Sequence, residues 1–453
     1  MRRQADLLHG VIWKQILIFF WPVLFGTLFQ QLYNTVDAVI VGNYVGKEAL
    51  GAVGGSTGTV INLLVGFVTG LSCGATVVIA QCCGKNDHEG VRRGVDSGMF
   101  MALFLGIILT AAGILTAPWI LRILNVPDAI YGLSLIYMQL YFIGMVPTLI
   151  YNTGSAILRA VGDSRRPLYF LIVSAVINII LDILFVAVLK MSVSGAALAT
   201  VIAQSASCLM TLRVLRAASD SYHFDFKTMR FDMKTMVRII AIGFPTGIQS
   251  CLYSVANLFI QSSVNSYGTD VVAAYTAFGK IDALFWNYSG ALGTSLLTFT
   301  GQNFGAGDLK RVKKGILQGI GIDIAGSLLI TAVCFFGGIY MFRMFTDDAG
   351  VIEAGVSMLK YLCPYWVTFA GVEILSSSIR SCGDSFVPMC MTAVGIGALR
   401  IIWILFYPSE NIFDTLRCYP ISWIVTSLLF VIYYLEGSWL KRSLKQREKI
   451  LTA

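Results

Sequence analysis

The sequence predicts an all-α polytopic membrane protein with twelve transmembrane helices arranged in two six-helix lobes. Three observations lead to this class. First, 56% of the 453 residues are hydrophobic and only 13% are charged, whereas about a quarter of the residues in a typical soluble chain are charged. Second, twelve stretches contain the roughly 20 apolar residues that a transmembrane helix needs. Third, the two halves of the chain repeat one another.

The twelve apolar stretches occupy almost the whole chain. Pro22 and Pro245 lie inside the first and the seventh stretch, where each proline removes a backbone hydrogen bond and should bend its helix. We expect the spans at residues 13–43, 50–81, 92–117, 129–159, 166–189, 193–216, 236–266, 271–302, 313–341, 352–380, 386–407 and 417–440.

The distribution of Lys and Arg predicts the orientation of these spans. With a cytoplasmic N-terminus, 25 of the 33 basic residues fall in cytoplasmic segments and 6 in external ones. Cytoplasmic loops are enriched in Lys and Arg, so we expect both termini in the cytoplasm of a multi-pass protein of the inner (plasma) membrane. The net charge of +8 then follows from the loops and does not indicate a nucleic-acid partner.

Two loop motifs recur at one offset and divide the chain into halves. Gln81–Asp87 matches Gln302–Asp308, and Arg159–Ser164 matches Arg380–Ser385, both 221 residues apart (302 − 81 and 380 − 159). Gly and Asp in these loops favour tight turns and helix caps over substrate contact. Since each half has an even number of spans, a pseudo-twofold axis along the membrane normal should relate the halves, with a cavity between them. We expect an N-terminal lobe at 1–216, a cytoplasmic linker at 217–234, a C-terminal lobe at 235–440 and a basic tail at 441–453.

The first span carries a carboxylate in an apolar setting. Gln30, Asn34 and Asp37 are spaced i, i+4, i+7 and share one helix face. A carboxylate in hydrocarbon costs about 3 kcal/mol on insertion scales, so it normally faces a bundle interior or a water-filled cavity. We expect Asp37 to bind a proton or a cation. The alternative is a polar group that only hydrogen-bonds to a neighbouring helix.

The fifth and sixth spans add polar pairs at helical spacing. Asn178 and Asp182 are i, i+4, and so are Thr200 and Gln204. No Lys or Arg lies near the middle of the first six spans to pair with Asp37 or Asp182. Two unpaired carboxylates that lie close together repel when both are ionised, so they should take up a proton readily or share a metal cation such as Na⁺. An ion-coupled transporter needs this behaviour.

The second half has both signs of charge inside its spans, and also Asp323. Because Lys280 and Arg400 can pair with Asp282 and Glu373, a structural ion-pair network is at least as good an interpretation as a transport site. Glu373 remains a secondary candidate for the substrate cavity. The other candidates to line that cavity are Gln30, Asn34, Tyr137, Asn152, Gln204, Gln249 and Asn257.

The chain has no motif for an energy-consuming or catalytic site. No G-x-x-x-x-G-K-[ST] loop occurs, so the energy for transport should come from an ion gradient or the membrane potential. We therefore expect no enzymatic activity, no cofactor and no structural metal site.

Several of these segments together resemble the multidrug and toxic compound extrusion (MATE) family over nearly the whole chain. The resemblance rests on Pro22, on Tyr33-Asn-Thr-Val-Asp37-Ala-Val-Ile-Val-Gly42, and on the repeated loops at Gln81, Gln302, Arg159 and Arg380. Asp37 and the Asn178-x-x-x-Asp182 pair resemble the DinF-type branch of that family.

The resemblance implies a function and a site. The function is that of a secondary active antiporter, working as a monomer, which exports amphipathic organic cations or other toxic compounds in exchange for H⁺ or Na⁺ by alternating access. Pro22 is implied as the hinge whose bending follows protonation of Asp37. The implied ion-binding cluster consists of Asp37, Asn178, Asp182 and Thr200.

Two other classes remain as alternatives. A lipid-linked saccharide flippase of similar architecture would need a basic, anion-binding cavity, whereas the first six spans contain acids. A channel or a signalling receptor would need pore-lining rings or a soluble effector domain, and the two-lobe repeat argues against both.

Overall fold

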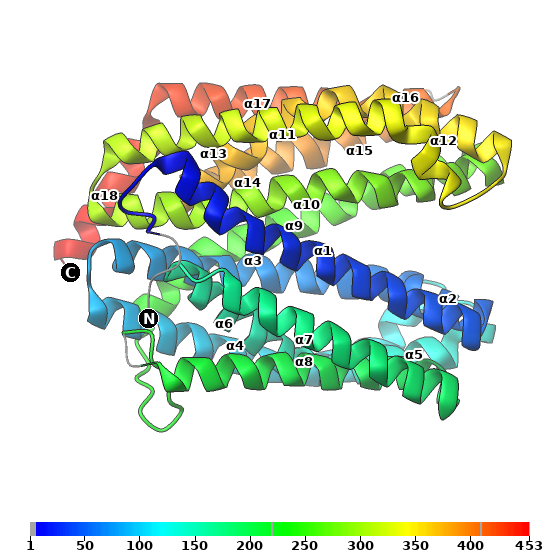
Figure 1. The fold of residues 1–453 in the computed structure, drawn as a ribbon, viewed down its shortest axis with the longest axis horizontal. Helices are drawn as coiled ribbons and strands as arrows, with labels where there is room; N and C mark the ends of the chain where they lie inside the picture. The colour runs from blue at the N-terminus through cyan, green and yellow to red at the C-terminus, as the bar shows by residue number, and fades with distance from the viewer. Residues whose placement is uncertain (1–5, 219–220, 408–409, 453) are drawn as a thin grey trace. The chain divides into compact units, whose positions relative to one another are not determined.

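The computed structural model describes residues 6–218, 221–407 and 410–452 (Figure 1). These residues form helices and no strand, which confirms the predicted all-α class. The chain separates into two compact units. Among the described residues, unit 1 comprises Trp21–Gly247, and unit 2 comprises Asp6–Phe20 and the chain from Ile248 onward.

The predicted spans all lie in helical segments. Nine helices of the described chain are long and apolar enough to cross a membrane, and the pair α5–α6, bent by 47° around Gly144, makes a tenth. Two of the twelve predicted spans are not among these ten. Residues 271–302 belong to a single helix, α10, that carries Lys280 and Asp282, whereas residues 352–380 are interrupted by the 3₁₀ turn Cys363–Phe369.

Unit 1 contains most of the first half of the chain, and its helices lie side by side in blue to green colours in Figure 1. Helix α6 packs against α3, α4 and α8, and α7 packs against α8. The helices are α1 (Ile12–Tyr44), α2 (Lys47–Gly54), α3 (Ser56–Gly84), α4 (His88–Ile123), α5 (Asp128–Ile143), α6 (Met145–Ala160), α7 (Arg165–Asp182), the π-helix η1 (Ile183–Val188) and α8 (Ser192–Ala217).

Unit 2 contains most of the second half. Helix α10 packs against α11, α12 and α13, and the rings of Phe285 and Trp366 stack at its core with centroids 5.0 Å apart. The helical segments are α9 (Met233–Val264), η2 (Asn265–Tyr267), α10 (Thr269–Ala306), α11 (Leu309–Arg343), α12 (Ala349–Leu362), η3 (Cys363–Phe369), α13 (Ala370–Ser381), α14 (Phe386–Thr392), η4 (Ala393–Ala398), α15 (Leu399–Phe406), α16 (Ile412–Leu416), α17 (Cys418–Glu436) and α18 (Ser438–Thr452).

Two helices change unit near a proline. Helix α1 passes from unit 2 to unit 1 after Phe20, next to Pro22, and α9 passes from unit 1 to unit 2 after Gly247, close to Pro245. A proline leaves the carbonyl one turn earlier without its helical hydrogen bond, so a helix bends most easily there. The units thus differ from the predicted lobes at 1–216 and 235–440. Unit 1 includes the start of α9, up to Gly247, and unit 2 includes the start of α1, up to Phe20.

The first half of α9 is held in unit 1 by a glycine crossing with α3. Gly70 and Gly74 of α3 meet Gly243 and Gly247 of α9. A methyl group added at Gly74 would lie 2.1 Å from the carbonyl oxygen of Ile239. Small residues spaced by four let two helix backbones approach closely inside a membrane, and we call this contact the glycine crossing.

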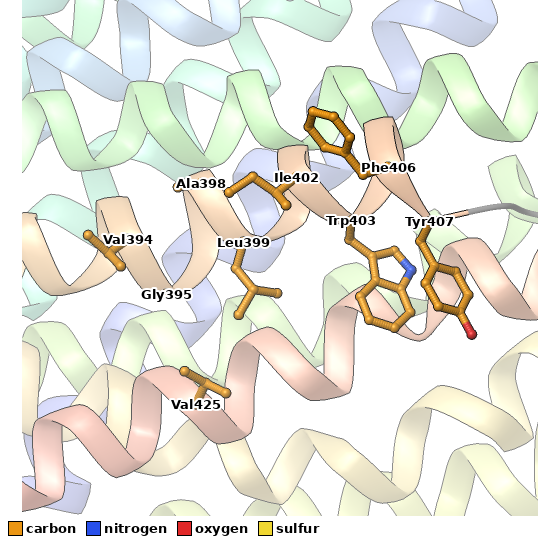
Figure 2. A pocket seen from close by; sticks show the side chains of 9 residues that line it. All are labelled: Val394, Gly395, Ala398, Leu399, Ile402, Trp403, Phe406, Tyr407 and Val425. Carbon is orange, nitrogen blue, oxygen red and sulfur yellow. The ribbon is translucent and has the colours of Figure 1, made fainter.

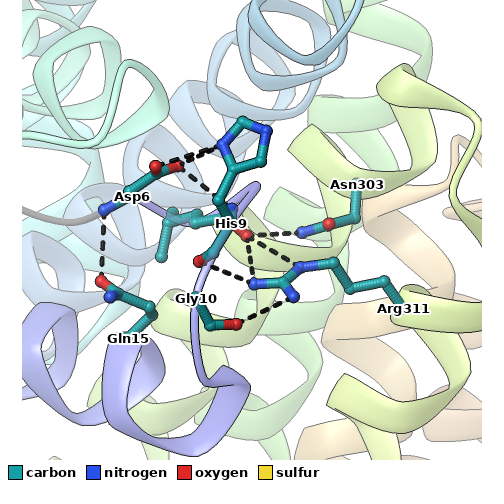
Figure 3. A network of polar contacts seen from close by, with 7 residues as sticks. Asp6, His9, Gly10, Gln15, Asn303 and Arg311 are labelled. Atoms are coloured by element: carbon teal, nitrogen blue, oxygen red, sulfur yellow. Dashed lines mark hydrogen bonds and ion pairs between the residues drawn. The ribbon is translucent and has the colours of Figure 1, made fainter.

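The start of the described chain is attached to unit 2 by Arg311, as Figure 3 shows. The Arg311 guanidinium donates to the carbonyl oxygens of His9 and Gly10, each at 3.0 Å, and of Leu7 at 3.4 Å. Asn303 Nδ2 also donates to the Leu7 carbonyl oxygen, at 3.0 Å. We call this set of contacts the N-terminal latch.

The repeated loops of the sequence are caps and turns. Asp87 Oδ1 accepts a hydrogen bond from Gly90 N at 2.8 Å, and Asp308, 221 residues later, accepts one from Arg311 N at 2.9 Å. Each carboxylate thereby satisfies a free backbone donor at a helix start. The loops therefore shape the fold, as their composition favours.

Candidate functional site

Two buried carboxyl groups of unit 1 lie together. Asp37 of α1 is 8% exposed and Asp182, the last residue of α7, is 0% exposed. Their side chains are within hydrogen-bonding reach of one another. We call them the acid pair.

The acid pair has no compensating cation. Among the described residues, no ion pair includes Asp37 or Asp182. No donor reaches Asp37 Oδ1 or either oxygen of Asp182. Because two ionised carboxylates only accept hydrogen bonds, a proton or a cation has to join them.

Asn178 stands one helical turn before Asp182 and is 1% exposed. Both its Oδ1 and its Nδ2 are buried without a hydrogen-bond partner. A buried amide without partners is costly unless a ligand or water completes its hydrogen bonds. The predicted pair Asn178 and Asp182 therefore offers unused oxygen atoms beside the carboxyl of Asp37.

Tyrosines surround the acid pair. Tyr33, Tyr137 and Tyr141 all interact electrostatically with Asp37. The ring centroids of Tyr137 and Tyr141 lie 6.3 Å apart. Phenol groups can donate to a carboxylate and accept from a protonated carboxyl, so they suit either protonation state of the acid pair.

The backbone after Asp182 has an unusual geometry. Helix α7 continues into the π-helix η1, where the Leu189 N–H bonds to the Leu184 carbonyl oxygen at 2.8 Å, five residues back. Such π segments are rare and occur frequently at functional sites. Here the wider turn begins directly at the second acid.

The other candidates of unit 1 are spread over its helices. Thr200 is buried, and its hydroxyl donates to the Ala196 carbonyl oxygen at 3.0 Å, which leaves the oxygen free to accept. Gln30 and Asn34 are exposed on α1, whereas Asp37 on the same helix is buried, and Asn152 is half-buried on α6.

Gln249, Asn257 and Glu373 belong to unit 2. Gln249 is buried, donating to Thr392 Oγ1 at 2.9 Å and accepting from Arg380 at 3.2 Å. Asn257 is exposed, and Glu373 accepts from Ser377 at 3.3 Å. Hence the cavity candidates of the sequence form two sets, one in each unit.

The ion-pair network considered for the second half is not present, and that interpretation was wrong. Lys280 is exposed, and among the described residues no ion pair joins Lys280, Asp282, Glu373 or Arg400. Asp282 instead accepts from two indole N–H groups. An acid can be satisfied by indole N–H donors, and a basic side chain can lie against an aromatic face. The two then need not form an ion pair.

Asp323 is a buried acid that the sequence reasoning did not select. It is 0% exposed on α11, both its oxygens lack a hydrogen-bond partner, and it interacts electrostatically with Glu373. The signal that could have found it was the one used for Asp37, an acid in the middle of an apolar span.

An apolar groove of unit 2 is separate from both sets of candidates. It has a volume of about 410 Å³ and lies between η4–α15 and α17, as Figure 2 shows. Trp403 and Tyr407 stack at one end of it, with ring centroids 4.3 Å apart. Ile402 and Phe406 are exposed there, so the groove belongs to the apolar outer surface of the spans.

The described residues contain no cluster of three His, Cys, Asp or Glu side chains that could hold a metal ion. A cation at the acid pair would therefore draw its remaining ligands from amide, hydroxyl or carbonyl oxygens. Asn178 and the tyrosines supply such oxygens, which are the ligands that hard cations prefer.

Comparison with known proteins gives consistent matches. The family model described as MatE matches residues 22–184 and 245–405. The chain is 29% identical over 448 residues to "Probable multidrug resistance protein YpnP" of Bacillus subtilis, covering 96% of this chain and 97% of that protein. It is 27% identical over 444 residues to "Probable multidrug resistance protein YoeA" of the same organism, covering 96% and 95%.

A solved structure matches along the whole fold. It is described as the outward-facing conformation of a multidrug resistance MATE family transporter, with a TM-score of 0.90 and 22% identity. The match covers 98% of this chain and 99% of that chain. It shows that the folds are alike.

Proposed function

The chain belongs to the MatE family of multidrug efflux transporters, and from this premise we propose that it is a secondary active antiporter. It exports amphipathic organic cations or other toxic compounds and takes up H⁺ or Na⁺ in exchange. The resemblance to the family is confirmed, whereas the assignment to its DinF-type branch stays a prediction.

The acid pair is the observation that carries the coupling proposal. Asp37 and Asp182 are buried, adjacent and without a cation, while Asn178 beside them has unused hydrogen-bonding atoms. One proton or one monovalent cation shared by the two carboxyl groups removes their mutual repulsion and leaves a single negative charge. In a transporter, an intramembrane acid of this kind is by default part of the ion path.

Coupling follows if the ion and the substrate favour different conformations. The ion binds the acid pair from the outside, the protein changes to its inward-facing state, the ion leaves, and a substrate from the cytosol or inner leaflet binds. A ligand shifts such an equilibrium only by its differential affinity for the two states. In this proposal Pro22, at the point where α1 changes unit, is the hinge that bends when Asp37 is neutralised.

The proposal extends to location and assembly. We infer a multi-pass protein of the plasma membrane, working as a monomer with both termini in the cytoplasm. The excess of Lys and Arg in the loops on one side supports this orientation.

The flippase alternative is less well supported. The relatives carry multidrug resistance names, and the acid pair gives unit 1 a negative rather than a basic site.

Gradient-driven efflux tests the proposal. Liposomes that contain the purified protein are loaded with ethidium, a permanently cationic dye. Either a pH gradient or a sodium gradient is then imposed across their membrane. We expect one of the two gradients to drive ethidium efflux by the wild-type protein. The same gradient should not drive efflux by Asp37→Asn. The control is Asp128→Asn, which removes an exposed acid from the first turn of α5.

Either of two outcomes would contradict the proposal. Normal gradient-driven efflux by Asp37→Asn would make the acid pair structural and move attention to Asp323 and Glu373. If the wild-type protein exports no cation under either gradient, the proposal that it is an antiporter is contradicted.

A further inference from the structure

A single buried guanidinium in unit 2 takes no part in the proposed ion exchange. Arg400, on α15, is 1% exposed. Its Nε donates to Ser422 Oγ at 2.9 Å, its Nη1 donates to Asn257 Oδ1 at 3.3 Å, and its Cζ lies 4.4 Å from the centre of the Tyr419 ring. Every one of these neighbours is electrically neutral.

The charge of Arg400 is not paired at short range. No carboxylate of the described chain lies within 4.0 Å of its nitrogen atoms. Asp282 interacts with it electrostatically from farther away. The two oxygens of Asp282 are already occupied, since they accept from Trp286 at 2.6 Å and from Trp366 at 3.1 Å.

One end of the guanidinium has no partner at all. Nη2 of Arg400 is buried and makes no hydrogen bond. An ionised donor without partners is among the most costly groups to bury. Each such group in a native structure calls for an explanation, and a ligand that supplies the missing acceptor is one.

A second unused donor lies on the same aromatic patch. Trp423 is 1% exposed, and its Nε1 also has no hydrogen-bond partner. The Tyr419 ring contacts both groups, because it lies under the guanidinium and 5.5 Å from the Trp423 ring. Two buried donors next to one ring form a cluster that lacks an acceptor.

One partner of the Arg400 guanidinium, Asn257 on α9, is exposed. Asn257, whose Oδ1 accepts from Nη1, belongs to a line of polar residues on this helix at four-residue spacing, which runs from Gln249 through Tyr253 to Gln261. Residues four apart share a helix face. A polar ligand bound at Asn257 therefore lies next to the guanidinium.

From these contacts we propose that Arg400, assisted by Asn257 and Trp423, binds the carboxylate or phosphate of an amphipathic substrate. A guanidinium offers paired donors that match the two oxygens of such a group. The inference rests on the proposed function and narrows it, since the substrate range then includes molecules with an anionic group. The coupling ion and this group use different units, the acid pair of unit 1 and the Arg400 cluster of unit 2.

The test compares two dyes that differ only in the anionic group. Rhodamine B has a free carboxylate, and its methyl ester is a cation with the same ring system. Binding to purified protein is followed by fluorescence anisotropy. We expect wild type to prefer the acid, and Arg400→Gln to reduce this preference by about tenfold to a hundredfold, the range for a charge-assisted hydrogen bond. Affinity for the ester should stay unchanged.

Three further variants separate binding from folding. Arg343→Gln makes the same chemical change at an exposed site and should leave the preference intact. Arg400→Lys keeps the charge without the paired donors and should retain only part of the preference. Asn257→Leu alters an exposed residue, so a weaker preference for the acid in this variant supports the site even if Arg400→Gln does not fold.

The outcomes distinguish the site from the transport function. Equal binding of both dyes by wild type, or an unchanged preference in Arg400→Gln, would overturn the oxyanion site even if efflux of the ester continued. Loss of the preference on addition of phosphatidylglycerol would assign the cluster to a lipid headgroup and overturn its role in substrate binding. Absence of gradient-driven export for both dyes would contradict the antiporter proposal instead.

Discussion

A methyl group has no room at the glycine crossing of unit 1. In Gly74→Ala the new Cβ would lie 2.1 Å from the Ile239 carbonyl oxygen and 2.8 Å from the Gly243 nitrogen, both backbone atoms that no rotamer change can move away. Overpacking of this kind costs typically about 1–3 kcal/mol. It exceeds the gain of about 1 kcal/mol that alanine brings to a helix.

Gly321→Ala is the matched control, because Gly321 is exposed in α11 and no atom lies within 4 Å of an added Cβ. It should gain stability from helix propensity alone. Since both variants gain the same helix propensity, they should differ by the overpacking cost, which corresponds to roughly 2 to 12 °C in melting temperature at about 2–4 °C per kcal/mol for units of this size.

The assay is thermal unfolding of the two detergent-purified variants, followed by intrinsic fluorescence. A Gly74→Ala protein that melts at or above the temperature of Gly321→Ala would refute the close crossing of α3 and α9. It would also remove the reason for assigning the first half of α9 to unit 1.

Two further predictions concern residues at helix starts. Arg311→Gln should release the N-terminal latch, because the guanidinium donates to three carbonyl oxygens, and limited proteolysis should then cut near His9 faster than in wild type. Hydrogen bonds from Thr235, first from its hydroxyl, hold the pKa of the Asp232 carboxyl below its ordinary value. A carboxyl with a lowered pKa contributes stability above its unfolded pKa and loses this contribution as the pH falls through its folded pKa. Asp232→Ala should therefore cost about 1 kcal/mol of stability at pH 7, the value of a lost cap, and less at acid pH, which melting temperatures measured at both pH values would show. Unchanged cleavage near His9 would contradict the first prediction. An equal loss of stability of Asp232→Ala at pH 7 and at acid pH would contradict the second.

The fold was predictable because its main signals are local. Apolar stretches and the positions of Lys and Arg identify membrane spans without any knowledge of packing. The repeat at Asp87 and Asp308 predicts loops that cap helices, and both carboxylates do so. What sequence could not show is where a helix changes partner, because Pro22 and Pro245 mark a bend and not the unit on either side.

The candidate site was predictable in part for a similar reason. Asp37 and Asp182 stand out one by one as acids in apolar spans, and helical spacing adds Asn178. Their contact depends on how α1 packs against α7, which spacing along one helix cannot reveal.

The second half shows the limit of arguments from charge alone. Lys280, Asp282 and Arg400 have complementary charges, which favoured ion pairs. The structure satisfies Asp282 with indoles and leaves Arg400 among neutral groups. Charge sign predicts pairing only when the side chains point toward each other, and a sequence does not contain that direction.

A double-mutant cycle on gradient-driven ethidium efflux tests most directly whether Asp37 and Asp182 act as one ion site. The variants are Asp37→Asn, Asp182→Asn and the double variant, with Asp128→Asn as control. Residues that act as a unit are strongly non-additive, so the double variant should be no worse than either single one, and each single variant should lose gradient-driven efflux. A shared ion site would be contradicted if the efflux rate of the double variant fell by the product of the two single losses. It would also be contradicted if either single variant kept wild-type efflux.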